Sequence, residues 1–230
     1  MILNKLFNKI SGSIVKVSGL LILFFLISHT LFAHDVDGEL ANMSRKDIAW
    51  LYLQLGFTHI LPLGFDHILF ILSLYLLNPK LKPILLQATA FTIAHTITLG
   101  LSMYNLILLP AAIVEPIIAL SIMYVAMENI FSPALKKSRL IVVFIFGLIH
   151  GMGFASALKE LGLPQNSYLS SLILFNVGVE LGQVFVILSA YFLFGKWFGN
   201  KVWYRPRIVI PISICIAIIA LYWTVQRIFF

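Results

Sequence analysis

The sequence predicts an all-α protein, a polytopic transmembrane helical bundle of about six spans that follows an N-terminal signal peptide. Hydrophobic residues make up 60% of the chain and charged residues only 11%, and the mean hydropathy is +1.00. Soluble domains carry roughly 25% charged residues, so this composition excludes an ordinary soluble enzyme. Short polar turns divide the apolar sequence into stretches near the bilayer-crossing length of about 20 residues.

Residues 1–33 have the composition of a secretory signal peptide. A basic region, an apolar core at residues 17–27 and a cleavage site that ends at Ala33 follow one another. An uncleaved signal anchor is the alternative. Residues 34–54 are then expected to form a short extracytoplasmic leader and an interfacial helix.

The transmembrane domain is predicted over residues 55–230, with turns that contain proline or asparagine between successive spans. The six predicted spans are 55–78, 83–108, 111–131, 140–158, 168–194 and 208–226.

The basic residues predict the orientation of the bundle. The chain has a net charge of +7, and loops 79–83, 132–139 and 195–207 hold most of the Lys and Arg that follow the signal peptide. Basic loops stay in the cytoplasm. We therefore expect a multi-pass protein of the bacterial cytoplasmic (inner) membrane with its mature N-terminus outside. Because the charge excess reflects topology, the expected partner is the lipid bilayer and no nucleic acid.

Ionisable side chains inside the predicted spans carry the functional signal. A charge at the centre of a transmembrane helix costs ~2.5–3.5 kcal/mol, so each such group must be paired, protonated or bound to a cation. Since the single cysteine, Cys215, lies in an apolar run, a metal would have to be held by nitrogen and oxygen. The residues in question are Asp66, Glu115, Glu128, Glu180, His59, His67, His95 and His150.

The first span combines three of these residues with a helix breaker. His59 and Asp66 are seven residues apart, a spacing that places them on one helix face, and His67 follows directly. Pro62 and Gly64 predict a kink or a break between them, and broken spans are where transporters place ion sites. A kink held by an Asp–His pair between helices is the alternative.

Three later spans place polar side chains near their middle. Thr92 and Thr98 lie three residues before and after His95, and one of them is expected to orient its ring. Asn176, Glu180 and Gln183 share one face of the fifth span. The G-x-x-x-G spacing, which allows close helix approach, occurs twice: Gly147 and Gly151 lie in the fourth predicted span, and Gly178 and Gly182 lie in the fifth.

Together these residues predict a divalent transition-metal site near the bilayer midplane. Imidazole and carboxylate ligands suit nickel, cobalt, zinc or iron without selecting among them. The predicted ligands are His59, Asp66, His67, His95, His150 and Glu180. Roles in outer access or in orienting the ligands are assigned to Glu115, Asn176, Gln183, Thr92 and Glu128. The alternative for Glu115 is a solvated carboxylate at the membrane interface. The alternative for Glu128 is a structural ion pair with Lys136, Lys137 or Arg139.

Successive motifs carry a family resemblance over about residues 45–195. In order, GFTHILPLGFDHILF (56–70), FTIAHT (91–96), VEP (114–116), FGLIHGMGFA (146–155) and FNVGVELGQ (175–183) resemble the HupE/UreJ family of membrane proteins, most closely its Bacteroidetes-type branch.

The resemblance implies nickel or cobalt uptake, which the wider family is associated with beside hydrogenase and urease genes. The family's His…Gly-x-Asp-His signature maps onto His59, Gly64, Asp66 and His67. Ile60-Leu61 stand where hydrogenase-linked members carry a His-Pro pair, so the metal stays open. The family resemblance is also compatible with a homo-oligomer, or with partner proteins that mature metalloenzymes.

The sequence therefore predicts a membrane-embedded transition-metal permease of the nickel/cobalt type, or a metal-binding membrane component. One alternative is an intramembrane metalloenzyme such as a zinc hydrolase, although the chain has no H-E-x-x-H motif. The other is a structural or assembly protein whose polar residues only hold helices together. No catalytic residue is assigned.

Overall fold

The computed structural model describes residues 43–107, 109–160 and 168–230. These described residues are helical and include no β-strand. The predicted signal peptide at residues 1–33 and the leader at 34–42 lie outside the described residues, so both stay predictions.

The helices follow one another with short connections. In chain order they are α3 (Arg45–Ile60), α4 (Phe65–Leu77), α5 (Leu81–Met103), α6 (Ala111–Phe131), α7 (Arg139–Glu160), α8 (Tyr168–Ala190), α9 (Lys196–Phe198) and α10 (Ile210–Phe229). Two π-helical turns, Tyr191–Gly195 and Arg205–Val209, join α8 to α9 and lead into α10.

Four helical stretches among the described residues are long and apolar enough to cross a membrane. They are Leu81–Met103, Ala111–Phe131, Tyr168–Phe198 and Arg205–Phe229. The pair α3 and α4 qualifies together as one further, bent span. The apolar part of α7, Arg139–Ala155, is shorter, so the predicted span at 140–158, the fourth in chain order, stays a prediction.

The first predicted span is two helices rather than one. α3 ends at Ile60, α4 begins at Phe65, and the pair is bent by 66° at the break. The predicted break at Pro62 and Gly64 is therefore confirmed. α3 also runs without interruption across residue 54, where the sequence analysis placed the boundary between an interfacial helix and the first span.

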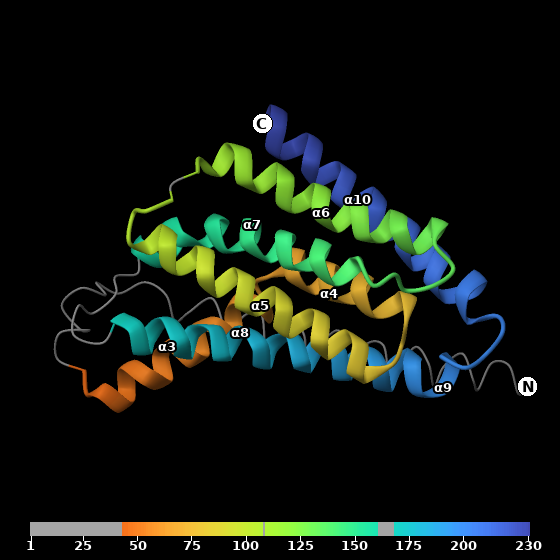
Figure 1. Cartoon of the computed structure of the whole chain (residues 1–230), viewed down its shortest axis with the longest axis horizontal. Helices are drawn as coiled ribbons and strands as arrows, with labels where there is room; N and C mark the ends of the chain where they lie inside the picture. The colour runs from red at the N-terminus through yellow and green to blue at the C-terminus, as the bar shows by residue number, and fades with distance from the viewer. Residues whose placement is uncertain (1–42, 108, 161–167) are drawn as a thin grey trace, which may run out of the picture. The chain divides into compact units, whose positions relative to one another are not determined.

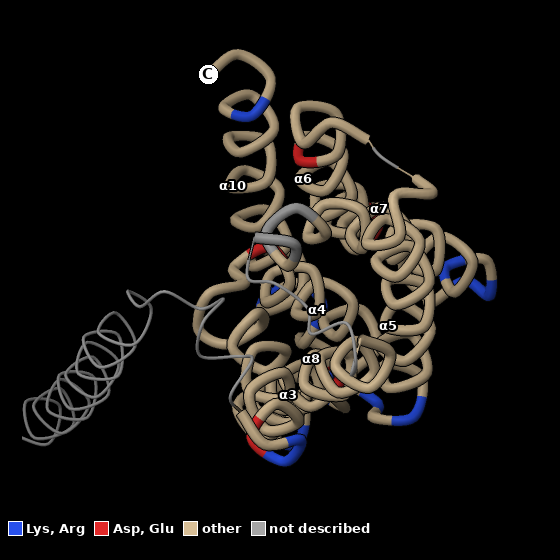
Figure 2. The backbone as a smooth tube through the Cα atoms, turned by 90° about the vertical axis from the view of Figure 1, so that its left-hand side faces the viewer, with Lys and Arg blue, Asp and Glu red and all other residues tan. Residues whose placement is uncertain are grey.

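The helices pack as three pairs around α4. α3 lies along α8, α5 along α7, and α6 along α10 (Figure 1). The view along the bundle shows α4 enclosed by these pairs (Figure 2). Since half of α4 is buried, including His67, Phe70 and Ser73, side chains on this short helix can meet residues from most of the bundle.

Glycines allow two of the pairs to approach closely. A Cβ at Gly178 of α8 would lie 2.1 Å from the Leu53 carbonyl oxygen of α3. A Cβ at Gly147 of α7 would lie 2.5 Å from the Phe91 carbonyl oxygen of α5. Neither distance is possible for a real side-chain atom, so backbone meets backbone at these contacts.

A buried arginine, Arg139, connects three helices at the end of the bundle that lies away from the α3–α4 break. Arg139 is 2% exposed; its guanidinium donates to the Asn129 side-chain oxygen at 3.1 Å and to the Ser73 carbonyl at 3.3 Å. It also lies 3.4 Å from a Glu128 carboxylate oxygen. These contacts connect α4, α6 and α7, and they give Glu128 a structural partner.

The α3–α8 contact yields a stability prediction. Gly178→Ala should force the two backbones apart and destabilise the protein by roughly 1–3 kcal/mol, the usual range for overpacking. Gly100→Ala is the matched control, because its new Cβ would meet only the flexible end of Leu172 at 3.2 Å. Thermal unfolding of both variants in detergent measures the difference. Equal melting temperatures for the two variants would contradict the close-packing interpretation.

Candidate metal centre

The break between α3 and α4 brings two histidines together. His59 is next to the last residue of α3, and His67 lies in the first turn of α4. Their ring centroids are 4.7 Å apart. A Cβ at Gly64 would lie 2.1 Å from the His59 carbonyl oxygen, so only glycine allows the chain to turn this closely after His59.

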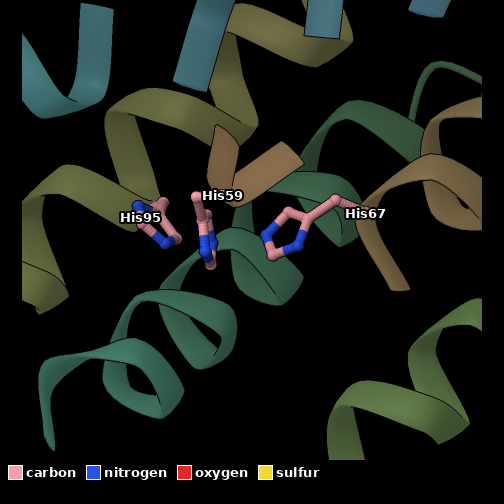
Figure 3. Close-up of side chains that lie close together, drawn as sticks. All are labelled: His59, His67 and His95. Atoms are coloured by element: carbon pink, nitrogen blue, oxygen red, sulfur yellow. The ribbon is translucent and has the colours of Figure 1, made fainter. Parts of the chain in front are cut away.

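A third histidine reaches the same point from α5. One ligand atom each of His59, His67 and His95 lies within 4.8 Å of the others. The rings converge from three helices (Figure 3). Because imidazole nitrogens bind transition metals at about 2.0–2.1 Å, binding requires only a small inward movement of the rings.

Each of the three histidines has a buried ring nitrogen that lacks a hydrogen-bond partner. The Nε2 atoms of His59, His67 and His95 are all buried without a hydrogen bond. A buried polar atom without a partner costs free energy, about 1–3 kcal/mol for each group. Three such atoms at one place indicate a ligand that completes them.

Asn176 fixes the tautomer of His95. The Asn176 amide nitrogen donates to the Leu172 carbonyl at 2.8 Å, so its side-chain oxygen is oriented toward His95 Nδ1 at 3.2 Å and accepts a proton from it. With the proton on Nδ1, the Nε2 lone pair of His95 is free for a metal. The sequence analysis expected Thr92 or Thr98 in this role, whereas in the structure Asn176 contacts the ring and both threonine hydroxyls bond elsewhere.

His150 lies beside this group without belonging to it. Its ring centroid is 5.2 Å from that of His67. Ser121 donates its hydroxyl hydrogen to the Ile118 carbonyl at 2.7 Å, so the contact at 3.1 Å between His150 Nε2 and the Ser121 hydroxyl oxygen is an Nε2–H donation. The buried Nδ1 of His150 therefore keeps a free lone pair.

Aromatic rings surround the histidines. Phe154 lies 4.0 Å and Phe175 5.6 Å from the His59 ring centroid. Phe91 lies 5.9 Å from His67 and 4.9 Å from His150. This apolar wall limits access of water, which strengthens electrostatic interactions inside the site.

Asp66 lies apart from the histidine group. Its carboxylate forms an ion pair with Arg227 near the end of α10, at 2.8 Å. Arg227 also donates to the Glu115 carbonyl oxygen at 3.2 Å, while the Glu115 side chain is exposed. Sequence spacing did not reveal the Asp66–Arg227 pair, because its partners are 161 residues apart.

Glu180 also lies outside the histidine group. Its two carboxylate oxygens accept hydrogen bonds from Thr89, at 2.7 Å, and from Thr92. Gln183 donates to the Thr92 hydroxyl oxygen at 2.9 Å. Of the predicted ligands, the structure thus brings together His59, His67 and His95, places His150 beside them, and separates Asp66 and Glu180.

The predicted glycines lie at the helix contacts that form the site. Gly151 of α7 faces the His95 carbonyl oxygen, which a Cβ would approach to 2.3 Å, and Gly182 of α8 faces the Ile60 side chain next to His59. Together with Gly147 and Gly178, they bring α7 and α8 against the helices that carry the histidines.

The ligand set has a defined chemical preference. Neutral imidazoles suit transition metals such as nickel, cobalt, zinc, copper and iron, whereas magnesium and calcium require oxygen ligands. The described group contains no carboxylate, so it would bind a divalent cation without neutralising its charge.

A comparison with protein-family models matches residues 36–227 of this chain to a family described as HupE / UreJ protein. No curated protein and no solved structure matches the chain.

The hydrogen bond between Asn176 and His95 can be tested by metal titration. Asn176→Leu should weaken binding of Ni²⁺ or Co²⁺ about 10–100-fold, because the imidazole loses the partner that fixes its tautomer. Gln87→Leu is the matched control: it removes another buried amide, which is bonded only to the Pro83 carbonyl on its own helix. Calorimetry on the purified proteins measures both. Unchanged affinity in Asn176→Leu would show that His95 is not a ligand.

Proposed function

The chain belongs to the HupE/UreJ family, and we propose that it is a transition-metal permease of the nickel/cobalt type whose cation passes through the histidine site. The family is associated with membrane transport of nickel and cobalt, and the structure has apolar helices of spanning length around a histidine cluster. These two findings support a role in membrane metal handling.

One observation carries the proposal. Three histidines from three different helices each bring a ring nitrogen within 4.8 Å of the others, and each has a buried Nε2 without a hydrogen-bond partner. Other buried side-chain atoms, such as the Tyr75 hydroxyl, also lack a partner, but only here among the described residues do three metal-binding side chains meet at one point. The unpaired nitrogens therefore favour a metal over a purely structural role.

The proposed ligands are His59, His67 and His95, with His150 as a fourth nitrogen through its free Nδ1. A site of neutral nitrogens accepts Ni²⁺, Co²⁺, Zn²⁺ or Fe²⁺. Because the Asp66–Arg227 pair lies at the same end of α4 as His67, we assign the outer mouth of the pathway to this pair. The mature N-terminus then faces outside the bacterial inner membrane.

The broken helix supports transport over simple storage of a metal. Discontinuous helices in transporters place an ion site where the backbone is interrupted and can rearrange. Here the interruption at residues 61–64 separates two of the proposed ligands, His59 and His67. A change in the α3–α4 angle would alter their separation and release the ion.

A membrane-embedded metalloenzyme is the second candidate, because three histidines with an open fourth position resemble the ligand set of catalytic zinc sites. Such an enzyme also needs a general base near the metal. Two carboxylates on helices α4 and α8, Asp66 and Glu180, lie outside the histidine group and already accept from Arg227 and from two threonines. A tightly held, stoichiometric zinc that resists chelators would favour the enzyme, and exchangeable binding the permease.

The permease proposal predicts loss of uptake when the ligands are removed. His67→Gln and His95→Gln should each lower accumulation of radioactive nickel or cobalt in cells at least tenfold, because glutamine lacks an imidazole lone pair. Thr96→Val is the control: it lies next to His95, and its hydroxyl bonds only to the Thr92 carbonyl. Accumulation is normalised to the amount of protein in the membrane. Wild-type accumulation in both histidine variants would refute the proposal.

A further inference from the structure

A carboxylate in the middle of α8 has no basic partner. Among the described residues, Asp66 is paired with Arg227 and Glu128 with Arg139, whereas no Lys, Arg or His forms an ion pair with Glu180. Glu180 is the thirteenth residue of a 23-residue helix that belongs to a candidate span. It therefore lies where an uncompensated charge is costly.

Hydroxyl and amide groups surround this carboxylate. Thr89 donates to Oε1 at 2.7 Å and Thr92 donates to Oε2. Gln183, which is fully buried, donates its Nε2 to the Thr92 hydroxyl at 2.9 Å, and its Oε1 has no hydrogen-bond partner. The cluster thus holds two carboxylate oxygens, two hydroxyl oxygens and one buried amide oxygen that lacks a donor.

Two hydroxyl groups orient a carboxylate but do not neutralise it. In a span, the remaining negative charge requires a proton or a bound cation. All of the available atoms are oxygens, which suit a proton or a small hard cation, whereas nickel and cobalt prefer the nearby imidazoles. The charge of a single carboxylate matches a monovalent ion.

We propose that Glu180, Thr89, Thr92 and Gln183 form a monovalent-cation site, filled by a proton or by Na⁺, whose occupancy is coupled to metal passage through the histidine site. The coupling part of this inference rests on the proposed function; the cation site itself does not.

The two sites share the same pair of helices. On α8, Asn176 holds His95, and Glu180 follows four residues later, about 6 Å along the helix axis. On α5, Thr92 precedes His95 by one turn and bonds to Glu180. A shift of α5 against α8 that breaks the Thr92–Glu180 contact would therefore also move His95, and binding at either site would change affinity at the other.

The groups that titrate near this region belong mainly to the histidine site. The helices packed against α8 bring His59 on α3, Asp66 and His67 on α4, and His95 on α5. Asp66 is held by Arg227. No basic side chain in the described part of these helices contacts the Glu180 carboxylate, so its charge is balanced only by the ion that it binds.

Carbodiimide labelling tests the cation site in the full-length protein in membrane vesicles. Dicyclohexylcarbodiimide reacts with protonated carboxyl groups in apolar surroundings, and mass spectrometry locates the adduct. We expect an adduct on Glu180 and none on the arginine-paired Glu128. If the ion is a proton, labelling should fall at least tenfold as pH rises; if it is Na⁺, added NaCl but not KCl should protect Glu180 at fixed pH.

Two threonine variants separate the site from general packing. Thr92→Val removes one donor to Glu180 and should extend labelling to higher pH or weaken protection by Na⁺. Thr96→Val removes a hydroxyl from the same helix that bonds only to the backbone and should label as wild type does. Glu180 labelling that ignores both pH and Na⁺, or that appears only after unfolding in detergent, would overturn the cation site.

The coupling is tested in proteoliposomes with an imposed gradient of the ion that labelling identifies. Wild-type protein should accumulate Ni²⁺ or Co²⁺ in a gradient-dependent way, and Glu180→Gln should lose at least tenfold of that accumulation. Gradient-driven accumulation that survives in Glu180→Gln would overturn the coupling. If wild-type protein moves no metal at all, the proposed function fails, but labelling of Glu180 in wild type and in His67→Gln still decides the cation site.

Discussion

The bend between α3 and α4 is the constraint on which the rest of the site depends. In a straight helix, His59 and His67 would lie eight residues apart, about 12 Å along the axis, too far to share one ion. The 66° bend reduces the separation of their ring centroids to 4.7 Å. It requires Gly64 beside the His59 carbonyl oxygen, and it places α4 at the centre of the three helix pairs. His95 and His150 can then reach the same region from α5 and α7.

The buried polar side chains differ in whether they have a partner of opposite charge. Asp66 and Glu128 have guanidinium partners at opposite ends of α4 and α6, where they tie the helices together. Breaking the more deeply buried pair, Arg139–Glu128, would leave one buried charge alone, which costs about 3–5 kcal/mol. Outside these two pairs, the imidazoles of the histidine group have buried nitrogens without partners, and the Glu180 carboxylate is held only by hydroxyls. These groups therefore remain open to ligands.

Sequence patterns predicted the features that depend on local chemistry. Apolar length predicted helices of spanning size, and Pro62 with Gly64 predicted the break, because both depend on neighbouring residues alone. The choice among the polar residues could not be made in this way. Asp66 adjoins His67 in sequence, yet successive residues point about 100° apart on a helix, and its partner Arg227 comes from the end of the chain. Likewise, spacing on α5 suggested Thr92 or Thr98 as the group that orients His95, whereas the packing of α5 on α8 brings Asn176 to the ring. Contacts between distant segments decide which polar residue meets which.

The absence of a carboxylate from the three-histidine group bears on whether its ion stays or passes. Three neutral imidazoles leave the charge of a divalent cation uncompensated in a largely apolar bundle, and isolated buried charge is strongly unfavourable. Three neutral imidazoles do hold a resident zinc in catalytic sites, where water or hydroxide completes the ligand set, so the position of the carboxylates is the distinguishing feature here. They lie outside the histidine group, and Glu180 is linked to His95 through Thr92 on α5. Under the proposed permease function, a nearby carboxylate that is not a ligand would favour a cation inside the bundle without fixing it on the histidines. In that proposal, a change in the α3–α4 bend, which brings His59 and His67 together, would release the ion.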